Sequence, residues 1–282
     1  MFKEFQPNLE TRLSENHKQK AYELIHDIKD KISFYPAANI AGYDDEEAWG
    51  IRNELIEKNP DGVVQGLAGI TSEKAWRIRE SLITVCPHSV ARSLVGLNDD
   101  AAWQMRDRLL ELISKDGVAN GLAESVAFID DDRSWKLRHK LENVCLLNVL
   151  EGLNGLDSRR AWDFREKYKT NHPREVAASL IGLSNDKARQ WRKEFLSKGQ
   201  IEGVILSHLG SDSPEAWSLR KRHLKEYAFA VGTSLSGLEN EASWELRKEL
   251  KKKAEKENDS RVYKGLAQSL SSYMSAALKM KR

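Results

Sequence analysis

Arginine is the residue type whose spacing first suggests chemistry in this sequence. Eight arginines recur at intervals close to 27 residues, each three residues after a position that is nearly always tryptophan: Arg52, Arg79, Arg106, Arg138, Arg165, Arg192, Arg220 and Arg247. Such an Arg ladder could follow a phosphate backbone or acidic peptide groups. It could instead be structural, with each guanidinium over an indole or bonded to a neighbouring helix end. Strict periodicity favours packing, because positions that contact a partner should vary from unit to unit.

Histidine, cysteine and glycine form no recognisable catalytic or metal-binding pattern. The seven histidines lack H-E-x-x-H or His/Cys ligand spacing. There is no G-x-S-x-G, Walker loop or dinucleotide fingerprint. Cys86 precedes Pro87 and His88, but no third group in the sequence orients that pair. We therefore expect no enzyme activity and no catalytic, cofactor-binding or metal-binding residues.

Composition limits the class of protein further. The chain has 282 residues, of which 40% are hydrophobic and 31% charged, enough apolar material for a core. No apolar run approaches the roughly 18 residues of a membrane span, and the first residues lack a signal-peptide core. Two cysteines fit a reducing compartment. We expect a cytoplasmic protein with no membrane insertion.

The tryptophans locate an internal repeat. They are Trp49, Trp76, Trp103, Trp135, Trp162, Trp191, Trp217 and Trp244. Successive units start 27, 27, 32, 27, 27, 28 and 27 residues apart; in the sixth unit Arg189 holds the tryptophan position and Trp191 follows it. The unit reads V-x-x-S-L-x-G-L-x(4)-A-W-x-x-R-x-x-L. A fixed period of this length indicates tandem structural repeats.

Each unit predicts two helices and a tight turn. The helix that carries tryptophan has apolar residues at spacings of three and four, so they share one face. We predict its N-cap five residues before the tryptophan, as at Asp44 and Asp212, with capping-box partners Glu47 and Glu215. The shorter V-x-x-S-L helix is predicted to end at a glycine such as Gly96.

The predicted fold class is all-α, a right-handed-type α-solenoid of about eight to nine 27-residue helix-turn-helix repeats in one elongated array. We expect three regions: a capping hairpin over residues 1–43, the tandem repeats over 44–250, and a basic loop with a capping helix over 251–282. Copies such as VARSLVGLNDDAAWQMRDRL (90–109) resemble HEAT-like repeats in their capped, Arg-bearing helix and glycine turn. VAASLIGL (176–183), with the Arg-bearing helix after it, has a weaker likeness to TAL-effector-type DNA-binding repeats.

The short helix contains one position that varies between units. It includes the candidate partner-contact residues Gln65, Arg92, Glu124, Glu151, Thr233 and Gln268. A solvated surface row is the alternative interpretation of these residues.

The first functional hypothesis is a non-enzymatic scaffold that binds a protein or extended peptide on the solenoid surface. The alternative is a nucleic-acid-binding solenoid that holds DNA or RNA through the Arg ladder. Residues 248–282 carry ten Lys/Arg and four Asp/Glu, so residues 1–247 have a net charge of −4, which argues against a basic face over the repeats.

Overall fold

The computed structural model describes residues 15–28, 37–38 and 40–270, and these are helical apart from their turns. The helices of the first half are α1 (Glu15–Ile28), α3 (Glu46–Leu55), α4 (Pro60–Gln65), α5 (Glu73–Leu82), α6 (Pro87–Ser93), α7 (Asp100–Glu111), α8 (Val118–Ser125) and α9 (Asp132–Glu151). They are followed by α10 (Arg159–Tyr168), α11 (Pro173–Ala178), α12 (Asp186–Ser197), α13 (Ile201–Ser207), α14 (Pro214–His223), α15 (Ala228–Ser234), α16 (Glu241–Glu257) and α17 (Ser260–Gln268). No strand occurs in these ranges, as the all-α prediction requires.

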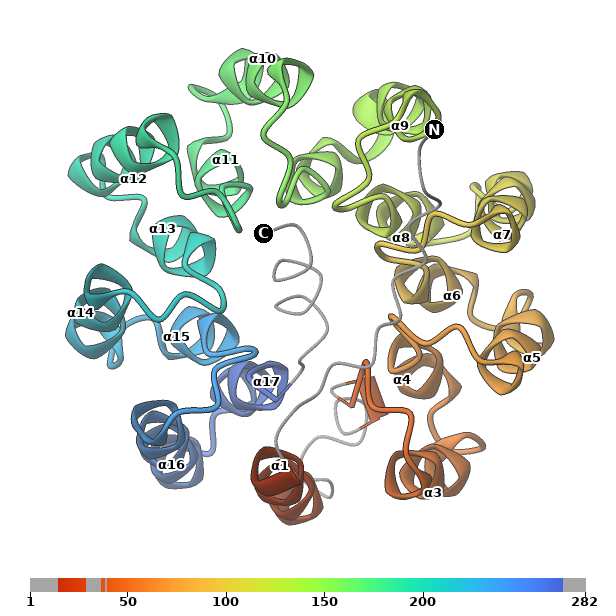
Figure 1. Ribbon diagram of the computed structural model, residues 1–282, viewed down its shortest axis with the longest axis horizontal. Helices are drawn as coiled ribbons and strands as arrows, with labels where there is room; N and C mark the ends of the chain where they lie inside the picture. The colour runs from red at the N-terminus through yellow and green to blue at the C-terminus, as the bar shows by residue number, and fades with distance from the viewer. Residues whose placement is uncertain (1–14, 29–36, 39, 271–282) are drawn as a thin grey trace.

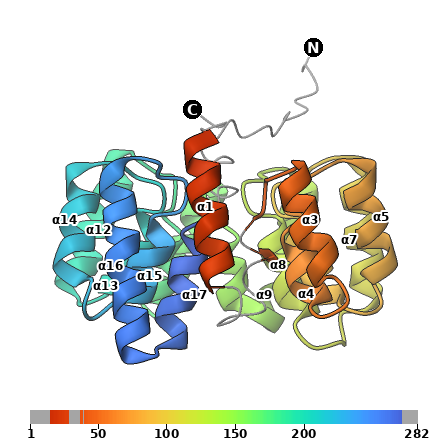
Figure 2. The same ribbon diagram turned by 90° about the horizontal axis from the view of Figure 1, so that it is seen from below.

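The helices form a ring of two layers (Figure 1). The outer layer holds α1 and the tryptophan-bearing helices α3, α5, α7, α10, α12, α14 and α16 together with the first part of α9. The inner layer holds the short helices α4, α6, α8, α11, α13, α15 and α17 and the last part of α9, and adjacent inner helices make the most extensive contacts. All the helices run roughly along the ring axis (Figure 2).

The outer helices begin one residue later than the sequence predicted. Their N-caps lie four residues before the tryptophan position; Asp45, for example, accepts from the Ala48 amide at 2.9 Å. The capping boxes expected at Asp44 and Asp212 are wrong, and the described box pairs Asp131 with Ser134. The reason is that the residue five before the tryptophan bonds the indole instead, which is described below.

The glycine turns are confirmed. The residue seven positions before the tryptophan position has positive φ in every unit, for example 73° at Gly96 and 80° at Gly182. Phe128 takes the same conformation at φ 68° although it has a side chain. The inner helices end three or four residues before this glycine, earlier than the sequence predicted, as α6 does at Ser93; the left-handed residue then sends the chain outward to the next outer helix.

Small residues in the inner layer explain the curvature. A Cβ on Gly121 would lie 2.5 Å from the His88 carbonyl oxygen, and one on Gly203 would lie 2.4 Å from that of Arg174. Inner helices therefore nearly touch through their backbones, while tryptophan and arginine side chains separate the outer helices. Each unit is a wedge, and successive wedges turn the chain into a ring. The elongated array expected from the sequence is wrong for this reason.

Gly121→Ala is expected to destabilise the protein by about 1–3 kcal/mol, because the added methyl meets backbone and must push α6 and α8 apart. Gly50→Ala is the matched control, because its Cβ would have nothing within 4 Å on the outer helix α3. That change should stabilise α3 by up to about 1 kcal/mol. Urea unfolding of both variants checks the contrast, and equal effects would mean that the inner layer is not tightly packed.

Helix α1 closes the ring between the two ends of the repeat array (Figures 1 and 2). The Lys20 ammonium lies 5.6 Å from the Trp244 ring centroid and 3.7 Å from a Glu241 carboxylate oxygen. Lys251 pairs with Asp27 at 2.7 Å. Residues from both ends share one apolar cluster that includes Ala21, Tyr22, Ile25, Trp244 and Leu270. The predicted N-terminal capping hairpin thus contributes a helix that contacts both ends, and its residues 29–36 lie outside the described part.

The structure also corrects the predicted loop after residue 250. Residues 251–257 continue α16 as helix, and α17 begins at Ser260. The lysines of this segment are paired in part, with Lys253 bonded to Glu257 at 2.6 Å. The remainder of the predicted C-terminal region, residues 271–282, lies outside the described residues.

Candidate functional site

The arginines of the ladder are enclosed in the protein. All eight are buried, the most accessible being Arg192 at 5%. Arg165 shows the shared pattern: its guanidinium donates to the carbonyls of Leu153 and Leu156 at 2.8 Å and of Ser179 at 2.9 Å. These carbonyls belong to the turn before α10 and to the end of the following inner helix α11. Each arginine therefore bonds an outer helix to the preceding turn and to its own inner helix.

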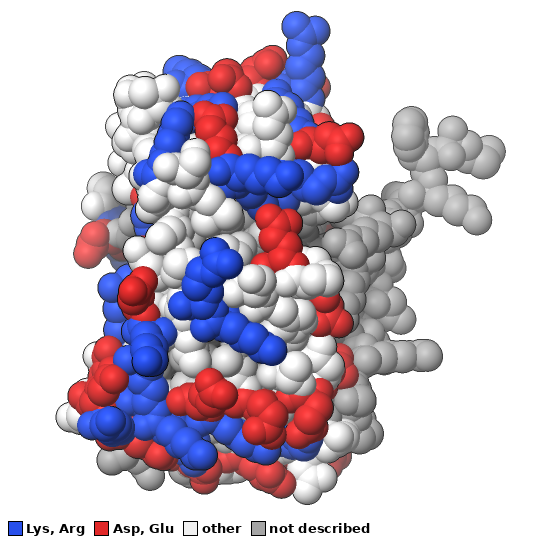
Figure 3. Space-filling view, turned by 90° about the vertical axis from the view of Figure 1, so that its left-hand side faces the viewer, with Lys and Arg blue, Asp and Glu red and all other residues white. Residues whose placement is uncertain are grey.

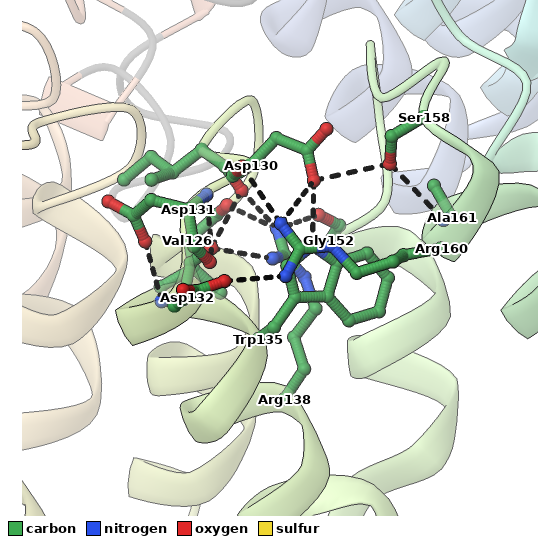
Figure 4. A network of polar contacts seen from close by, with 12 residues as sticks. Val126, Asp130, Asp131, Asp132, Trp135, Arg138, Gly152, Ser158, Arg160 and Ala161 are labelled. Atoms are coloured by element: carbon green, nitrogen blue, oxygen red, sulfur yellow. Dashed lines mark hydrogen bonds and ion pairs between the residues drawn. The ribbon is translucent and has the colours of Figure 1, made fainter.

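An indole covers seven of the eight guanidiniums from outside; the exception is Arg192, whose unit has Arg189 at the tryptophan position. The Arg165 guanidinium carbon lies 5.0 Å from the Trp162 ring centroid, and the Lys187 ammonium of the next unit lies 4.5 Å from the same ring. The Trp162 indole donates to Asp157 at 2.7 Å. Figure 4 shows the equivalent group in the fourth unit, where Trp135 lies with Arg138, Arg160 and Asp130. The carboxylate thus offsets part of the charge that the buried guanidinium brings inside.

The ladder is a packing feature. Burial lowers the pKa of Arg165 and Arg247 to about 9, and nearby acidic groups such as Asp157 act in the opposite direction. At neutral pH these groups stay charged, so each guanidinium keeps its carbonyl bonds. The structural interpretation of the ladder holds, and the phosphate-contact interpretation of these side chains is wrong because none of them faces solvent.

The candidate partner-contact residues lie on the inner helices, and neighbours bond across the layer. Gln65 donates to Ser89 at 3.0 Å, and Thr233 donates to Gln268 at 2.7 Å. Arg92 pairs with Glu124 at 2.9 Å, and Asn148 also donates to Glu124, at 2.8 Å. Glu151 lies on the last part of α9 between these helices and α11. The structure therefore gathers the predicted row into one band.

A second row of the same kind was missed in the sequence. It lies four residues before the first row, and residues four apart share a helix face: Asp61, His88, Asn120, Leu147, Arg174, Glu202, Phe229 and Lys264. None of the eight is fully buried. The sequence could have revealed this row in the same way as the first, because the residue type at this position also varies from unit to unit. We call the two rows together the inner wall.

The inner wall carries both signs of charge. Glu202 bonds Arg174 at 3.1 Å and Arg261 at 3.0 Å, so one carboxylate joins α11 to α17. The Arg261 guanidinium also lies 5.4 Å from the Phe229 ring centroid. The outer surface on the side of α12–α14 is similarly mixed, with Lys/Arg and Asp/Glu interspersed (Figure 3). Neither surface presents the continuous basic track that a phosphate backbone requires.

Glu151 is an inner-wall carboxyl with a raised pKa. Although the residue as a whole is exposed, desolvation of its carboxyl raises the pKa to about 7, and the Glu124 carboxylate adds to the shift while Arg174 and Arg92 oppose it. No side-chain hydrogen bond or ion pair joins Glu151 to the described residues. Arg174 and Arg92 therefore act on Glu151 from a distance, and neither is bonded to it.

One Ser/His/Asp group occurs on the inner wall, but its geometry is not that of a catalytic triad. Ser89 Oγ lies 2.9 Å from Asp61 and 3.0 Å from His88 Nε2, and Asp61 lies 3.5 Å from that same nitrogen. In a triad the carboxylate orients the imidazole through its other nitrogen. Ser89 is also fully buried. The group joins α4 to α6 and offers no accessible nucleophile.

The two cysteines occupy equivalent positions at the start of inner helices. Burial raises the pKa of the Cys86 thiol to about 12 and that of Cys145 to about 11. Cys145 also marks a kink (φ −146°, ψ 56°) where the outer and inner helices of the fourth unit join as α9. Both thiols are free, buried and protonated at neutral pH, which disfavours nucleophilic chemistry.

His208 makes stability depend on pH. It is buried between the ladder residues Arg192 and Arg220, and burial followed by these two charges lowers its pKa to about 3. The folded state thus excludes a proton that the unfolded state binds below about pH 6.5. Its contribution is constant above that pH and falls as the pH drops, with about 2 kcal/mol lost between pH 7 and pH 5.

His208→Leu should remove this pH-dependent loss, because leucine has no titratable group. The position should accept leucine, because five other units have leucine at the equivalent position, for example Leu180 and Leu235. Urea unfolding at both pH values provides the measurement. An identical pH dependence in the variant and the unchanged protein would show that folding does not lower the pKa of His208.

Among the described residues, no group of three or more His, Cys, Asp or Glu side chains is placed to hold a metal ion. The described helices include none with the length and apolar character needed to cross a bilayer. Comparisons of the chain with family models, with curated proteins and with solved structures find no match.

Proposed function

We propose that this protein is a non-enzymatic helical-repeat scaffold that binds a protein or an extended peptide along its inner wall. The observation that carries the proposal is the contrast between two sets of positions. The unit repeats its tryptophan, arginine and glycine for packing, whereas the two rows of the inner wall change residue type from one inner helix to the next. Positions that differ along a repeat array, on an accessible face, are where such proteins contact partners.

The chemistry of the wall suits a polypeptide. It offers paired charges at Arg92 and Glu124, amide and hydroxyl groups at Gln268 and Thr233, and an apolar side chain at Leu147. A peptide presents the same mixture of groups in return. DNA or RNA remains an outcome of the test, but no described surface feature favours it once the Arg ladder is assigned to packing.

The finer architecture belongs to the same proposal. We infer an α-solenoid of eight to nine 27-residue units, of the right-handed type and nearest to HEAT-like repeats, in which α1 is an additional unit. Supporting this, Ala21, Tyr22 and Lys20 match the alanine, aromatic and cation positions around Trp76. Lys20 covers Trp244 as Lys74 covers Trp49, so the contact between the chain ends follows the pattern of the other units.

The test combines a peptide selection with a nucleic-acid titration. A random peptide library displayed on phage is selected against the full chain, and the enriched peptides are titrated against the inner-wall variants Arg92→Gln and Arg174→Gln and the outer-surface control Arg159→Gln. Loss of affinity in the two wall variants alone is the expected result. Labelled DNA and RNA should not bind even at low salt.

Two results would contradict the proposed function. One is a selection that enriches no peptide with a measurable affinity. The other is micromolar binding of nucleic acid that weakens steeply with salt, since that slope reports phosphate contacts.

A further inference from the structure

The last part of α9 presents an unpartnered face on the inner wall. Val144 is 63% exposed and Leu147 is 45% exposed, and Glu151 is exposed as well. Leu147 and Glu151 are four residues apart and share one face of this short helix, and Val144 lies just before the kink at Cys145 from which the helix starts. Val85, in the turn before α6, is the other large hydrophobic side chain that is strongly exposed in the described part of the chain.

The surroundings leave this face without partners of its own. On α15 the partly exposed aromatic Phe229 is covered by Arg261 and Lys264 at 5.4 and 5.8 Å. Among the residues that the structure describes, no cation lies over Leu147 in the same way, and the two arginines that act on Glu151 are paired with other carboxylates. Arg92 pairs with Glu124 at 2.9 Å.

Arg174, on the other side, is held by carboxylates of its own. It bonds Glu202 at 3.1 Å and Glu175 at 3.2 Å. Glu151 is therefore an exposed carboxyl beside apolar side chains, with a second carboxyl, Glu124, as its neighbour on α8.

We propose that Val144, Leu147 and Glu151 form the contact site for a partner segment that carries apolar side chains and one lysine or arginine. This inference rests on the proposed function and names the class of peptide that the wall takes. The apolar side chains of the segment cover Val144 and Leu147, whose burial is favourable at about 25 cal/mol per Å². Its cation faces Glu151, because the neighbouring Glu124 carboxylate is already paired with Arg92 at 2.9 Å.

The site should respond to pH. The charged groups that face Glu151 are Glu124 from α8, Arg92 from α6, and Arg174 and Glu175 from α11. Desolvation of the carboxyl is the main reason that its pKa is raised to about 7; the two glutamates add to the shift and the two arginines oppose it. Glu151 gains its negative charge as the pH rises through that value. A cationic segment therefore binds more tightly at about pH 8 than at about pH 6.

The experiment titrates two labelled helical peptides against the full chain by fluorescence anisotropy. One peptide has Leu at spacings of three and four residues and Lys on the opposite helix face, and the other has Glu at every Lys position. The Leu/Lys peptide should bind at least about tenfold more tightly. Leu147→Gln and Glu151→Gln should each weaken it about fivefold to tenfold, and Glu151→Gln should also remove the pH dependence.

Matched controls separate this site from general electrostatic or hydrophobic attraction to the protein surface. The control for Val144→Gln is Val85→Gln, which changes the equivalent exposed valine of another unit. The control for Glu151→Gln is Glu166→Gln, which removes an exposed carboxylate from α10. Neither control should alter the affinity. All the substituted positions are exposed, and thermal unfolding followed by circular dichroism verifies that each variant folds.

The outcomes distinguish this inference from the proposed function. Equal affinity in Glu151→Gln and Glu166→Gln would overturn the α9 site. Peptides from the phage selection that bind Leu147→Gln and Glu151→Gln as well as the unchanged protein would also overturn it, yet leave the scaffold function standing. Failure of every peptide to bind would overturn both.

Discussion

Arg165→Met is expected to destabilise the folded protein by about 3–5 kcal/mol. The change removes the donors that satisfy the carbonyls of Leu153, Leu156 and Ser179, and these oxygens are left in a region without water. It also removes the cation beneath the Trp162 ring. Methionine fills much of the space but donates nothing to the carbonyls.

Arg159→Met is the control for this prediction, because Arg159 lies on the same helix with its side chain 95% exposed and an ion pair to Asp163 at 3.7 Å. Its loss should change stability by less than about 0.5 kcal/mol. Urea denaturation of both variants gives the comparison. Similar values for Arg159 and Arg165 would disprove the structural role of the ladder.

Trp103→Ala is expected to cost about 3–5 kcal/mol, because a large buried side chain is replaced by a cavity between two units. The indole lies 4.6 Å from the guanidinium carbons of both Arg106 and Arg133, and it donates to Asn98 at 2.7 Å. Trp103→Phe keeps an aromatic ring but loses the donor, so we expect a smaller loss than for alanine.

Trp217→Ala provides the comparison within the same chain. Trp217 is only half-buried, and the residue equivalent to Arg133 is Ala242, which brings no cation from the next unit over the ring. Its loss should be smaller than that of Trp103, as judged by thermal and urea unfolding. A loss below about 1 kcal/mol at Trp103 would contradict packing between units.

Local features of the fold follow closely from the sequence. The glycine turns were predictable because Gly96 and its equivalents fit a left-handed C-cap, and Gly96 has φ 73°. The N-caps were displaced by one residue because both Asp44 and Asp45 are good caps, and only the position of the indole decides between them. Asp44 bonds Trp49, and Asp45 is left to cap α3.

The candidate site was only partly predictable. The row that contains Arg92 and Glu124 was found because its residue type varies within a constant unit. The row that contains Leu147 was missed, although the same variation marks it. What makes Leu147 and Glu151 notable is the lack of neighbours able to cover them, and that depends on which helices lie beside α9.

The sequence by itself determined the units, their helices, their glycine turns and the lack of a recognised catalytic motif, because each of these depends on residues close together in the chain. Only the tertiary structure decided that Arg165 and its equivalents are enclosed, since their carbonyl partners come from the preceding turn and the following inner helix. Ring closure was decided in the same way. It depends on the small rotation between adjacent units, which backbone contacts such as that of Gly121 with His88 set, and on the fit of Lys20 against Trp244 from the far end of the chain.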